Sequence, residues 1–210
     1  QMLNLEGRIM QCREQRQQAE PLKYESEELL ALTAYVGYQS RGMPVNVTLD
    51  WQTRKHFEAG RDRYYRRVGQ MNLSCANCHQ DNWGKKLGPE TISQGHGNAY
   101  PIYRLEWQTV GSLHRRFRSC LSGVRAEMLP HGAPEFLDLE LYLAWRGSGL
   151  AQRLLDIALD WARESDWRRV ALSVLLTNQR AIAFYRKMGF VDEGALPVAE
   201  HGQREIRMAR

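Results

Sequence analysis

The five residues from Cys75 to His79 constrain this chain more than any other stretch of its sequence. They read Cys-Ala-Asn-Cys-His, and C-x-x-C-H is the spacing at which c-type haem is attached to a polypeptide. The two thiols can add to the two vinyl groups of haem, and the histidine that follows is placed to bind the iron. The motif therefore predicts covalent haem on Cys75 and Cys78, with His79 as the proximal iron ligand.

The same pair of cysteines has two other interpretations. A structural zinc site needs two more ligands at a suitable separation, and the remaining Cys120 or a single histidine does not form a recognisable second pair. A thioredoxin-like redox pair should follow a strand and open a helix within a βαβ unit. No such pattern is legible around Asn72. Haem is therefore the interpretation that the sequence favours.

A haem iron takes a second axial ligand unless it binds gas or substrate. The candidates downstream of the motif are His96, His114, Cys120, Met128 and His131. Cys120 ends a cationic run that contains His114, Arg115, Arg116 and Arg118, and nearby positive charges favour the thiolate over the thiol. We therefore expect a lowered pKa for Cys120 and a thiolate that can ligate iron. Met128 offers a thioether instead, and it stays open as the rival ligand.

The composition limits the remaining classes of protein. Of the 210 residues, 43% are hydrophobic and 25% are charged, which are ordinary values for a globular chain of one or two domains. No apolar run approaches the ~20 residues of a membrane helix, so we expect no membrane span. The net charge of +5 gives nucleic-acid binding little support, and an anionic small substrate fits it equally well. The chain begins without a charged-then-apolar leader, so an export signal is expected to have been removed or to lie outside this sequence.

Stretches on both sides of the haem motif resemble one family. They are Leu3–Ile9, Ala34–Val36, Ser40–Pro44, Leu73–His79, Ile92–Asn98, Tyr100–Arg104, Arg125–Glu127 and Leu139–Trp145. In this order they resemble the SoxA subunit of the SoxAX cytochromes of sulfur-oxidising bacteria. The resemblance covers residues 1 to about 146. It implies a mainly α, cytochrome c-like haem domain over residues 51–145, preceded over residues 1–50 by the remnant of an N-terminal cytochrome-like domain.

The resemblance also implies roles for individual residues. His79 would be the proximal ligand of haem c, and Cys120 the distal ligand and the sulfur-accepting catalytic residue, often found as a persulfide. Arg116 would hold the sulfonate end of thiosulfate. Where the family has proline after Ala126-Glu127, this chain has Met128. A simple electron-transfer cytochrome c with Met128 on the iron is therefore an alternative function for this part of the chain.

The activity implied is that of an L-cysteine S-thiosulfotransferase, which joins thiosulfate oxidatively to a carrier-protein cysteine. The family works in the periplasm beside a small cytochrome, SoxX. Its N-terminal domain carries a second cysteine site, either another haem or a disulfide, and the partner of Cys12 would lie upstream of Gln1. We therefore expect Cys12 to be an orphan thiol, which can pair between chains in an oxidising compartment.

The pattern of the chain changes after Trp145. The stretch from Arg146 to Gly149 precedes apolar residues at helical spacing, which predicts an amphipathic helix whose first backbone N–H groups can bind an anion. We expect a strand over residues 169–174, a helix over 178–188, and short strands over 190–193 and 205–208.

Residues 146–210 resemble the C-terminal half of GNAT-type N-acetyltransferases. The matching residues are Arg146, Gly147 and Gly149 of the R-G-x-G pyrophosphate loop, Asn178 and Tyr185. The resemblance implies that the loop and Asn178 hold acetyl-CoA and that Tyr185 protonates the departing thiolate, so acetyl transfer is a second alternative function. A whole GNAT domain has further strands before the loop, and here that place holds a helix-like stretch over 135–145. We therefore expect a partial α/β unit without a complete cofactor cleft and without useful acetyltransferase activity.

Overall fold

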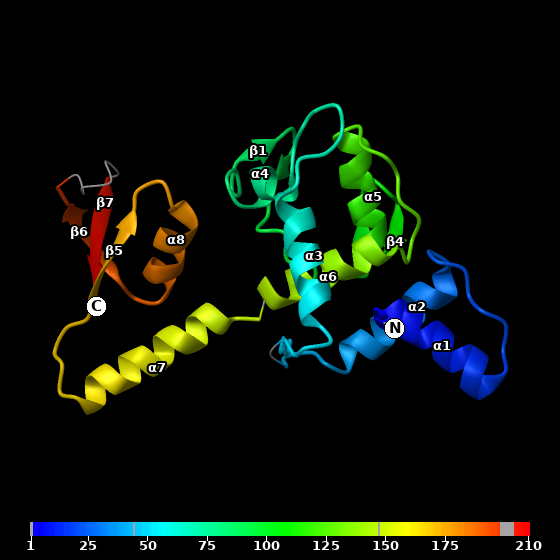
Figure 1. Ribbon diagram of the computed structural model, residues 1–210, viewed down its shortest axis with the longest axis horizontal. Coiled ribbons are helices and arrows are strands. Elements are labelled where there is room, and N and C mark those ends of the chain that lie inside the picture. Colours follow the sequence, from blue (N-terminus) through cyan, green and yellow to red (C-terminus); the bar gives the residue numbers. More distant parts are fainter. Residues whose placement is uncertain (1, 44, 147, 198–203) are drawn as a thin grey trace. The chain divides into compact units, whose positions relative to one another are not determined.

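The computed structural model describes residues 2–43, 45–146, 148–197 and 204–210 (Figure 1). The chain divides into two compact units, Gln1–Ser148 and Gly149–Arg210. Within the described ranges, no helix is long and apolar enough to cross a membrane.

The first unit is mainly helical, as the sequence predicts. Its helices are α1 (Leu5–Gln17), α2 (Glu27–Tyr38), α3 (Arg54–Tyr65), α4 (Cys75–His79), α5 (Leu113–Gly123) and α6 (Pro134–Arg146). Two short antiparallel hairpins lie between α4 and α5. They are formed by β1 (Lys86–Leu87) with β2 (Glu90–Thr91) and by β3 (Ile102–Arg104) with β4 (Thr109–Gly111).

Polar residues fix where several of these helices begin. Asn4, Ser26 and Ser112 each accept a hydrogen bond from a backbone N–H in the first turn of α1, α2 and α5, respectively. These bonds satisfy donors that the helix itself leaves without a partner. The short α4 has a reciprocal capping box between Ser74 and Asn77, so a helix of only five residues still has a defined start.

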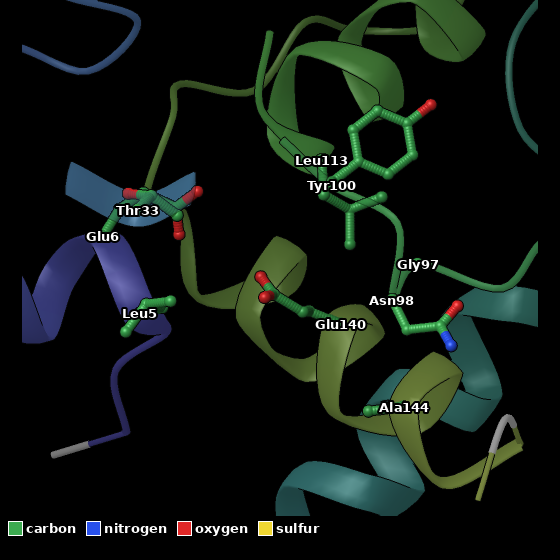
Figure 2. A pocket seen from close by; sticks show the side chains of 9 residues that line it. All are labelled: Leu5, Glu6, Thr33, Gly97, Asn98, Tyr100, Leu113, Glu140 and Ala144. Carbon is green, nitrogen blue, oxygen red and sulfur yellow. The ribbon is translucent and has the colours of Figure 1, made fainter. Parts of the chain in front are cut away.

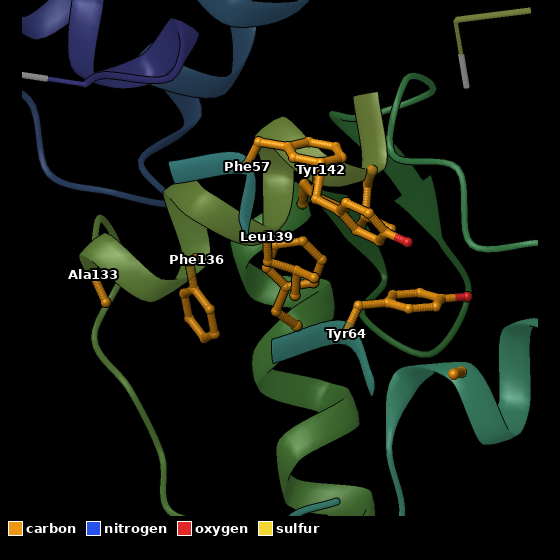
Figure 3. Packing of buried hydrophobic residues seen from close by; sticks show 10 residues of the cluster. Phe57, Tyr64, Ala133, Phe136, Leu139 and Tyr142 are labelled. Carbon is orange, nitrogen blue, oxygen red and sulfur yellow. The ribbon is translucent and has the colours of Figure 1, made fainter. Parts of the chain in front are cut away.

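The core of the first unit lies where α3 packs against α6. Phe57 and Tyr64 of α3 meet Phe136, Leu139 and Tyr142 of α6 in one buried cluster (Figure 3). The two helices approach so closely at Gly60 that a Cβ there would overlap the carbonyl group of Asp138. α4 packs against α3, and in this way the haem motif is attached to the packed core of the unit.

The second unit contains α7 (Leu150–Glu164), β5 (Ala171–Leu175), α8 (Gln179–Lys187), β6 (Val191–Ala195) and β7 (Glu205–Ala209). Its strands form an antiparallel sheet in the order β5-β7-β6, with an irregularity between Asp192 and Gly194. Leu159, Val174, Ile182, Phe190 and Met208 make a separate core. The three strands and the one helix expected after residue 165 are confirmed within about two residues, the usual uncertainty of an element boundary.

Candidate functional site

The ring of His79 is held in the form that binds a metal. Its Nδ1 lies 2.8 Å from the carbonyl oxygen of Ser93, and because a carbonyl only accepts, Nδ1 carries the proton. The lone pair therefore lies on Nε2. Burial lowers the pKa of His79, so the ring is neutral at neutral pH. A neutral imidazole whose other nitrogen is oriented by a backbone carbonyl is the usual arrangement of a histidine ligand.

Gly95 lies directly against the same ring. Its φ is +73°, and a Cβ at this position would be 2.8 Å from Cγ of His79. Only glycine combines this backbone conformation with so close an approach. The loop from Ser93 to Gly95 therefore fixes both the tautomer and the position of the His79 ring.

The fold brings Cys120 of α5 to the two cysteines of the haem motif. Burial raises the pKa of the Cys75 thiol to about 11, and a thiolate at Cys120 would raise it further by repulsion. A thiolate at Cys78 would likewise raise the pKa of Cys120 by repulsion. The three sulfurs therefore lie within the range of electrostatic interaction, although more than 40 positions separate Cys120 from the motif. Two thiols that can form thioethers to haem, followed by a neutral histidine, are the groups that attach haem c.

The prediction of a lowered pKa for Cys120 is wrong, because the structure gives a raised pKa. The Cys120 side chain still reaches solvent, but the protein atoms crowded around its sulfur disfavour the thiolate more than Arg116 favours it. The other cations of the run point elsewhere. The guanidinium of Arg115 lies over the ring of Trp107 at 4.6 Å, and Arg118 donates to the carbonyl of Leu129.

His114 makes its polar contacts with the loop before α6 and with α6 itself. It is 1% exposed, its Nδ1 accepts from the N–H of Gly132 at 3.0 Å, and its Nε2 lies 3.2 Å from a carboxylate oxygen of Glu140. Two other candidate iron ligands, His96 and Met128, have a polar partner and solvent beside them, respectively. His96 contacts Gln94 at 3.1 Å, and Met128 is 41% exposed in the loop between α5 and α6.

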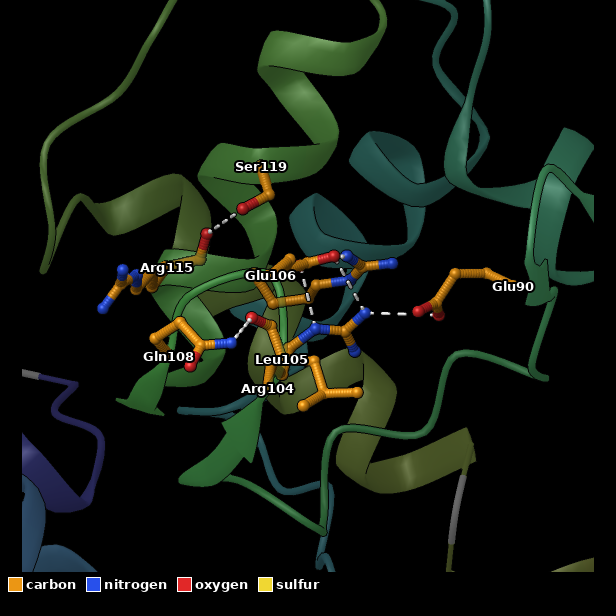
Figure 4. A network of polar contacts seen from close by, with 8 residues as sticks. Glu90, Arg104, Leu105, Glu106, Gln108, Arg115 and Ser119 are labelled. Atoms are coloured by element: carbon orange, nitrogen blue, oxygen red, sulfur yellow. Dashed lines mark hydrogen bonds and ion pairs between the residues drawn. The ribbon is translucent and has the colours of Figure 1, made fainter.

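Arg116 lies one helical turn before Cys120 on α5, and it joins a polar network around Glu106, which Figure 4 shows with Glu90 and Arg104. Its Nη1 lies 3.3 Å from Oε1 of Glu106. The same carboxylate accepts from Nε of Arg104 at 2.9 Å, and Arg104 also reaches Glu90 at 3.3 Å. Both arginines oppose the rise in the pKa of Cys120, so an anion beside this sulfur would meet two guanidinium groups.

Sequence reasoning missed Arg104 and Glu106 as members of this site. They lie at the end of β3 and in the turn before β4, and only the folded hairpin brings them to α5. The available signal was the stretch Tyr100–Arg104, which is one of those that resemble SoxA. Tyr100 also belongs here, since Arg104 and Arg116 hold down the pKa of its hydroxyl group while burial raises it.

A cavity of about 170 Å³ is lined by residues of α1, α2, α5 and α6 and by the segment that contains Tyr100 (Figure 2). Glu6 of α1 and Glu140 of α6 line it together with Thr33. Glu6 is 6% exposed, and burial, followed by repulsion from Glu140, raises the pKa of its carboxyl group. Asn4 donates from Nδ2 to Glu140 at 3.3 Å, which attaches the start of α1 to α6.

The residues expected to hold acetyl-CoA do not all lie in the second unit. Arg146 ends α6 of the first unit, where its guanidinium lies 4.4 Å from the ring centroid of Tyr64 and donates to the carbonyl of Gln94 at 3.3 Å. Gly147 is outside the described residues. Gly149 precedes α7 with a φ of +67°.

The other two residues of that expected site have structural roles in the second unit. Oδ1 of Asn178 accepts from the N–H of Ala181 at 3.1 Å and so caps α8. The ring of Tyr185 packs against Phe184 and Phe190, with centroid distances of 5.3 and 5.7 Å.

The first unit is similar to known SoxA proteins. Residues 1–45 match the model of the SoxA/TsdA cytochrome c domain. The L-cysteine S-thiosulfotransferase subunit SoxA of Pseudaminobacter salicylatoxidans is 42% identical over 150 residues, which are 71% of this chain and 52% of that protein. The first unit contains a SoxA-like cytochrome c domain. The corresponding subunit of Rhodovulum sulfidophilum is 40% identical over 147 residues, 70% of this chain and 51% of that protein.

A solved structure supports the same likeness. The crystal structure of SoxXA from P. pantotrophus matches with a TM-score of 0.67 and 36% identity, covering 70% of this chain and 55% of that chain. The SoxA-like chain thus spans about half the length of the curated relatives it matches. Residues 119–190 match the model of the acetyltransferase (GNAT) family. This second match begins within α5 of the first unit, whereas the sequence pattern places the GNAT-like segment at 146–210.

Proposed function

We propose that this chain is a c-type haem subunit of thiosulfate oxidation, which joins thiosulfate to a carrier-protein cysteine as an L-cysteine S-thiosulfotransferase does. The observation that carries the proposal is the position of Cys120. Its sulfur lies within electrostatic range of both cysteines of the haem motif, and Arg116 precedes it by one turn of α5. A cytochrome that only transfers electrons needs no thiol in the field of two guanidinium groups.

Cys75 and Cys78 would hold haem c covalently, and His79 would bind the iron through Nε2. His79 of α4 and Cys120 of α5 would be the two protein ligands of the iron. Haem c, when bound, supplies an acceptor for electrons. The protein contributes the orientation of both ligands, through the Ser93 carbonyl on one side and the helix α5 on the other.

Arg116 would bind the sulfonate end of thiosulfate and place its outer sulfur at Cys120. Joining the dianion to a thiol forms one S–S bond and releases one proton and two electrons. Haem c, when bound, would supply the acceptor for these two electrons, and a partner cytochrome would receive them from it. Burial makes the Cys120 thiol harder to ionise than a free cysteine. Arg116 and Arg104 partly offset this cost, because their positive charges favour a negative sulfur. Glu106 keeps both guanidinium groups at one place.

We further propose a SoxX-like small cytochrome and a carrier protein as partners, in the periplasm. The support for the cytochrome partner is the similarity of this chain to the crystal structure of SoxXA from P. pantotrophus. For the domains we propose a remnant of an N-terminal cytochrome-like domain over residues 1–50, a haem domain over 51–145 and a GNAT-like segment over 146–210.

Substitutions at three positions test the proposed roles. Arg116→Ala should keep the ferric spectrum of the haem protein and lower thiosulfate-dependent turnover, because Arg116 meets the substrate and not the iron. Cys120→Met should keep covalent haem, change the ferric spectrum and raise the reduction potential, since a thioether replaces a thiolate. Met128→Leu is the matched control and should leave the spectrum unchanged. A large spectral change from Met128→Leu, with none from Cys120→Met, would instead identify an electron-transfer cytochrome.

Acetyl transfer from acetyl-CoA is the second candidate function, and the GNAT match over residues 119–190 favours it. Against it stand the cap made by Asn178 and the packed ring of Tyr185. We therefore propose that the second unit does not catalyse acetyl transfer.

A further inference from the structure

Helix α7 carries an exposed apolar stripe that the proposed function does not use. Leu154, Ile157 and Trp161 are 59%, 66% and 62% exposed. They are spaced by three and four positions, so they follow one another along a single side of the helix. Leu159 and Ala162 of the same helix are buried, and Leu159 belongs to the core of the second unit. α7 is thus apolar on the face that the unit covers and again on a face that it leaves in water.

Large apolar side chains grouped on one exposed face are typical of an interaction surface. A tryptophan alone has an area of roughly 150 to 250 Å² to remove from water. Single exposed apolar residues need no such explanation, but three in register along two helical turns do. The stripe is therefore a candidate contact with another helix.

The charges beside the stripe indicate which helix fits it. Arg153 and Asp160 are both exposed, and their separation of seven positions places them on the same flank of α7, about two turns apart. Asp160 also pairs with Arg163 of its own helix. When two identical helices pair antiparallel about a two-fold axis, equal flanks face each other. An axis between positions 156 and 157 then sets Arg153 of each copy opposite Asp160 of the other.

The same axis also brings the apolar residues together. Ile157 lies next to the axis and meets its own counterpart. Trp161 lies about 7 Å from the axis along the helix and Leu154 about 4 Å on the other side, at a rise of 1.5 Å per residue. Trp161 of one copy therefore packs over Leu154 of the other. One register satisfies both the apolar stripe and the charged flank.

We propose that α7 pairs antiparallel with α7 of a second copy of this chain. The contact is isologous, since the same surface serves both copies. Each copy contributes three apolar side chains and the contact holds two symmetric ion pairs, so the area buried per partner is less than the ~800 Å² of a standard interface. The dimer is accordingly reversible and depends on protein concentration.

The first test compares two tryptophans of equal exposure. Trp161 lies in the stripe, and Trp167, which is 63% exposed, follows the end of α7. The full chain is studied by sedimentation equilibrium in a Cys12→Ser background with reductant, because Cys12 is an exposed free thiol that could crosslink copies. Trp161→Glu should raise the dissociation constant of the dimer at least tenfold, and Trp167→Glu should leave it within about twofold. Equal effects of the two substitutions would overturn the proposal.

A charge exchange tests the register. Arg153→Glu places two carboxylates opposite each other at both ends of the contact, and Asp160→Arg places two guanidinium groups there. Each variant alone should dimerise about tenfold more weakly, since exposed ion pairs contribute at most about a factor of five each. An equimolar mixture of the two variants restores both opposite-charge pairs and should dimerise as the parent does. A mixture no tighter than the separate variants, or a parent chain that stays monomeric at every concentration, overturns the proposal.

Discussion

Replacing Gly95 by alanine should disturb the haem motif without touching any of its own residues. The new Cβ would lie 2.8 Å from Cγ of His79 and 3.0 to 3.1 Å from its Cβ and Nδ1. The ring must then move by several tenths of an ångström. This movement lengthens the hydrogen bond between Nδ1 and Ser93, which is 2.8 Å long, and turns Nε2 away from its present direction.

The energetic cost has two parts that a control variant can separate. Alanine at a φ of +73° costs about 1 to 2 kcal/mol in backbone strain, and overpacking against His79 adds about 1 to 3 kcal/mol. Gly84 has a similar φ of +81° and no heavy atom within 4 Å of a Cβ built there. Gly84→Ala therefore carries the strain alone. We expect Gly95→Ala to be less stable than Gly84→Ala by about 1 to 3 kcal/mol.

Peptide-resolved amide hydrogen exchange measures this difference in the first unit alone. The slowest amides of α3 and α6 report its free energy of unfolding separately from that of the second unit. In the haem-bearing protein, Gly95→Ala should also change the ferric spectrum, and Gly84→Ala should not. Equal stabilities and equal spectra for the two variants would refute the reasoning that Gly95 positions His79.

Three further predictions follow from the packing and the charges. At Gly60 the overlap with α6 costs about 1 to 3 kcal/mol, and alanine adds ~1 kcal/mol to a helix, so Gly60→Ala should lower the free energy of unfolding by up to about 2 kcal/mol. Gly37→Ala, with open space around it, should raise it by up to about 1 kcal/mol, and urea unfolding distinguishes the two. The buried Glu6 has a pKa above its ordinary value of 4.5. The folded protein is therefore most stable with Glu6 protonated, and its free energy of unfolding falls as the pH rises through the folded-state pKa. In urea, the free energy of unfolding of Glu6→Gln should exceed that of the parent chain by an amount that grows from pH 4.5 to pH 8, and a difference independent of pH would contradict the burial of this carboxyl group. Acetyl-CoA at millimolar concentration should not protect the second unit from hydrogen exchange, and saturable protection that Tyr185→Phe removes would show a working cofactor site.

The sequence predicted those features that depend on neighbouring residues. The strands and the helix after residue 165 are such features, because their apolar periods and flanking glycines are local. The sequence could not predict that α6 extends to Arg146. A glycine-rich loop was expected there, but the helical stretch before it continues for one more residue, so Arg146 packs on Tyr64.

The pKa of Cys120 shows why counting charges in a sequence window is not enough. Four cationic or titratable side chains precede this cysteine, but on a helix they project about 100° apart. Arg115 and Arg118 are consequently turned to Trp107 and Leu129, which leaves Arg116 beside the sulfur. Burial, the larger effect on this thiol, has no local sequence signal. The support that Glu106 gives to Arg116 was equally invisible, because the β3–β4 hairpin meets α5 only in the folded chain.

The central claim is that Cys75 and Cys78 hold haem covalently, and intact mass after denaturation tests it most directly. The chain is exported in cells that possess haem-attachment machinery, alongside a SoxA relative as a positive control, and then denatured in acid and organic solvent. We predict that the red colour stays with the polypeptide, that its mass exceeds that of the chain by one haem, and that Cys75→Ala with Cys78→Ala loses both. A colourless chain of unmodified mass from cells that load the control protein would contradict this claim.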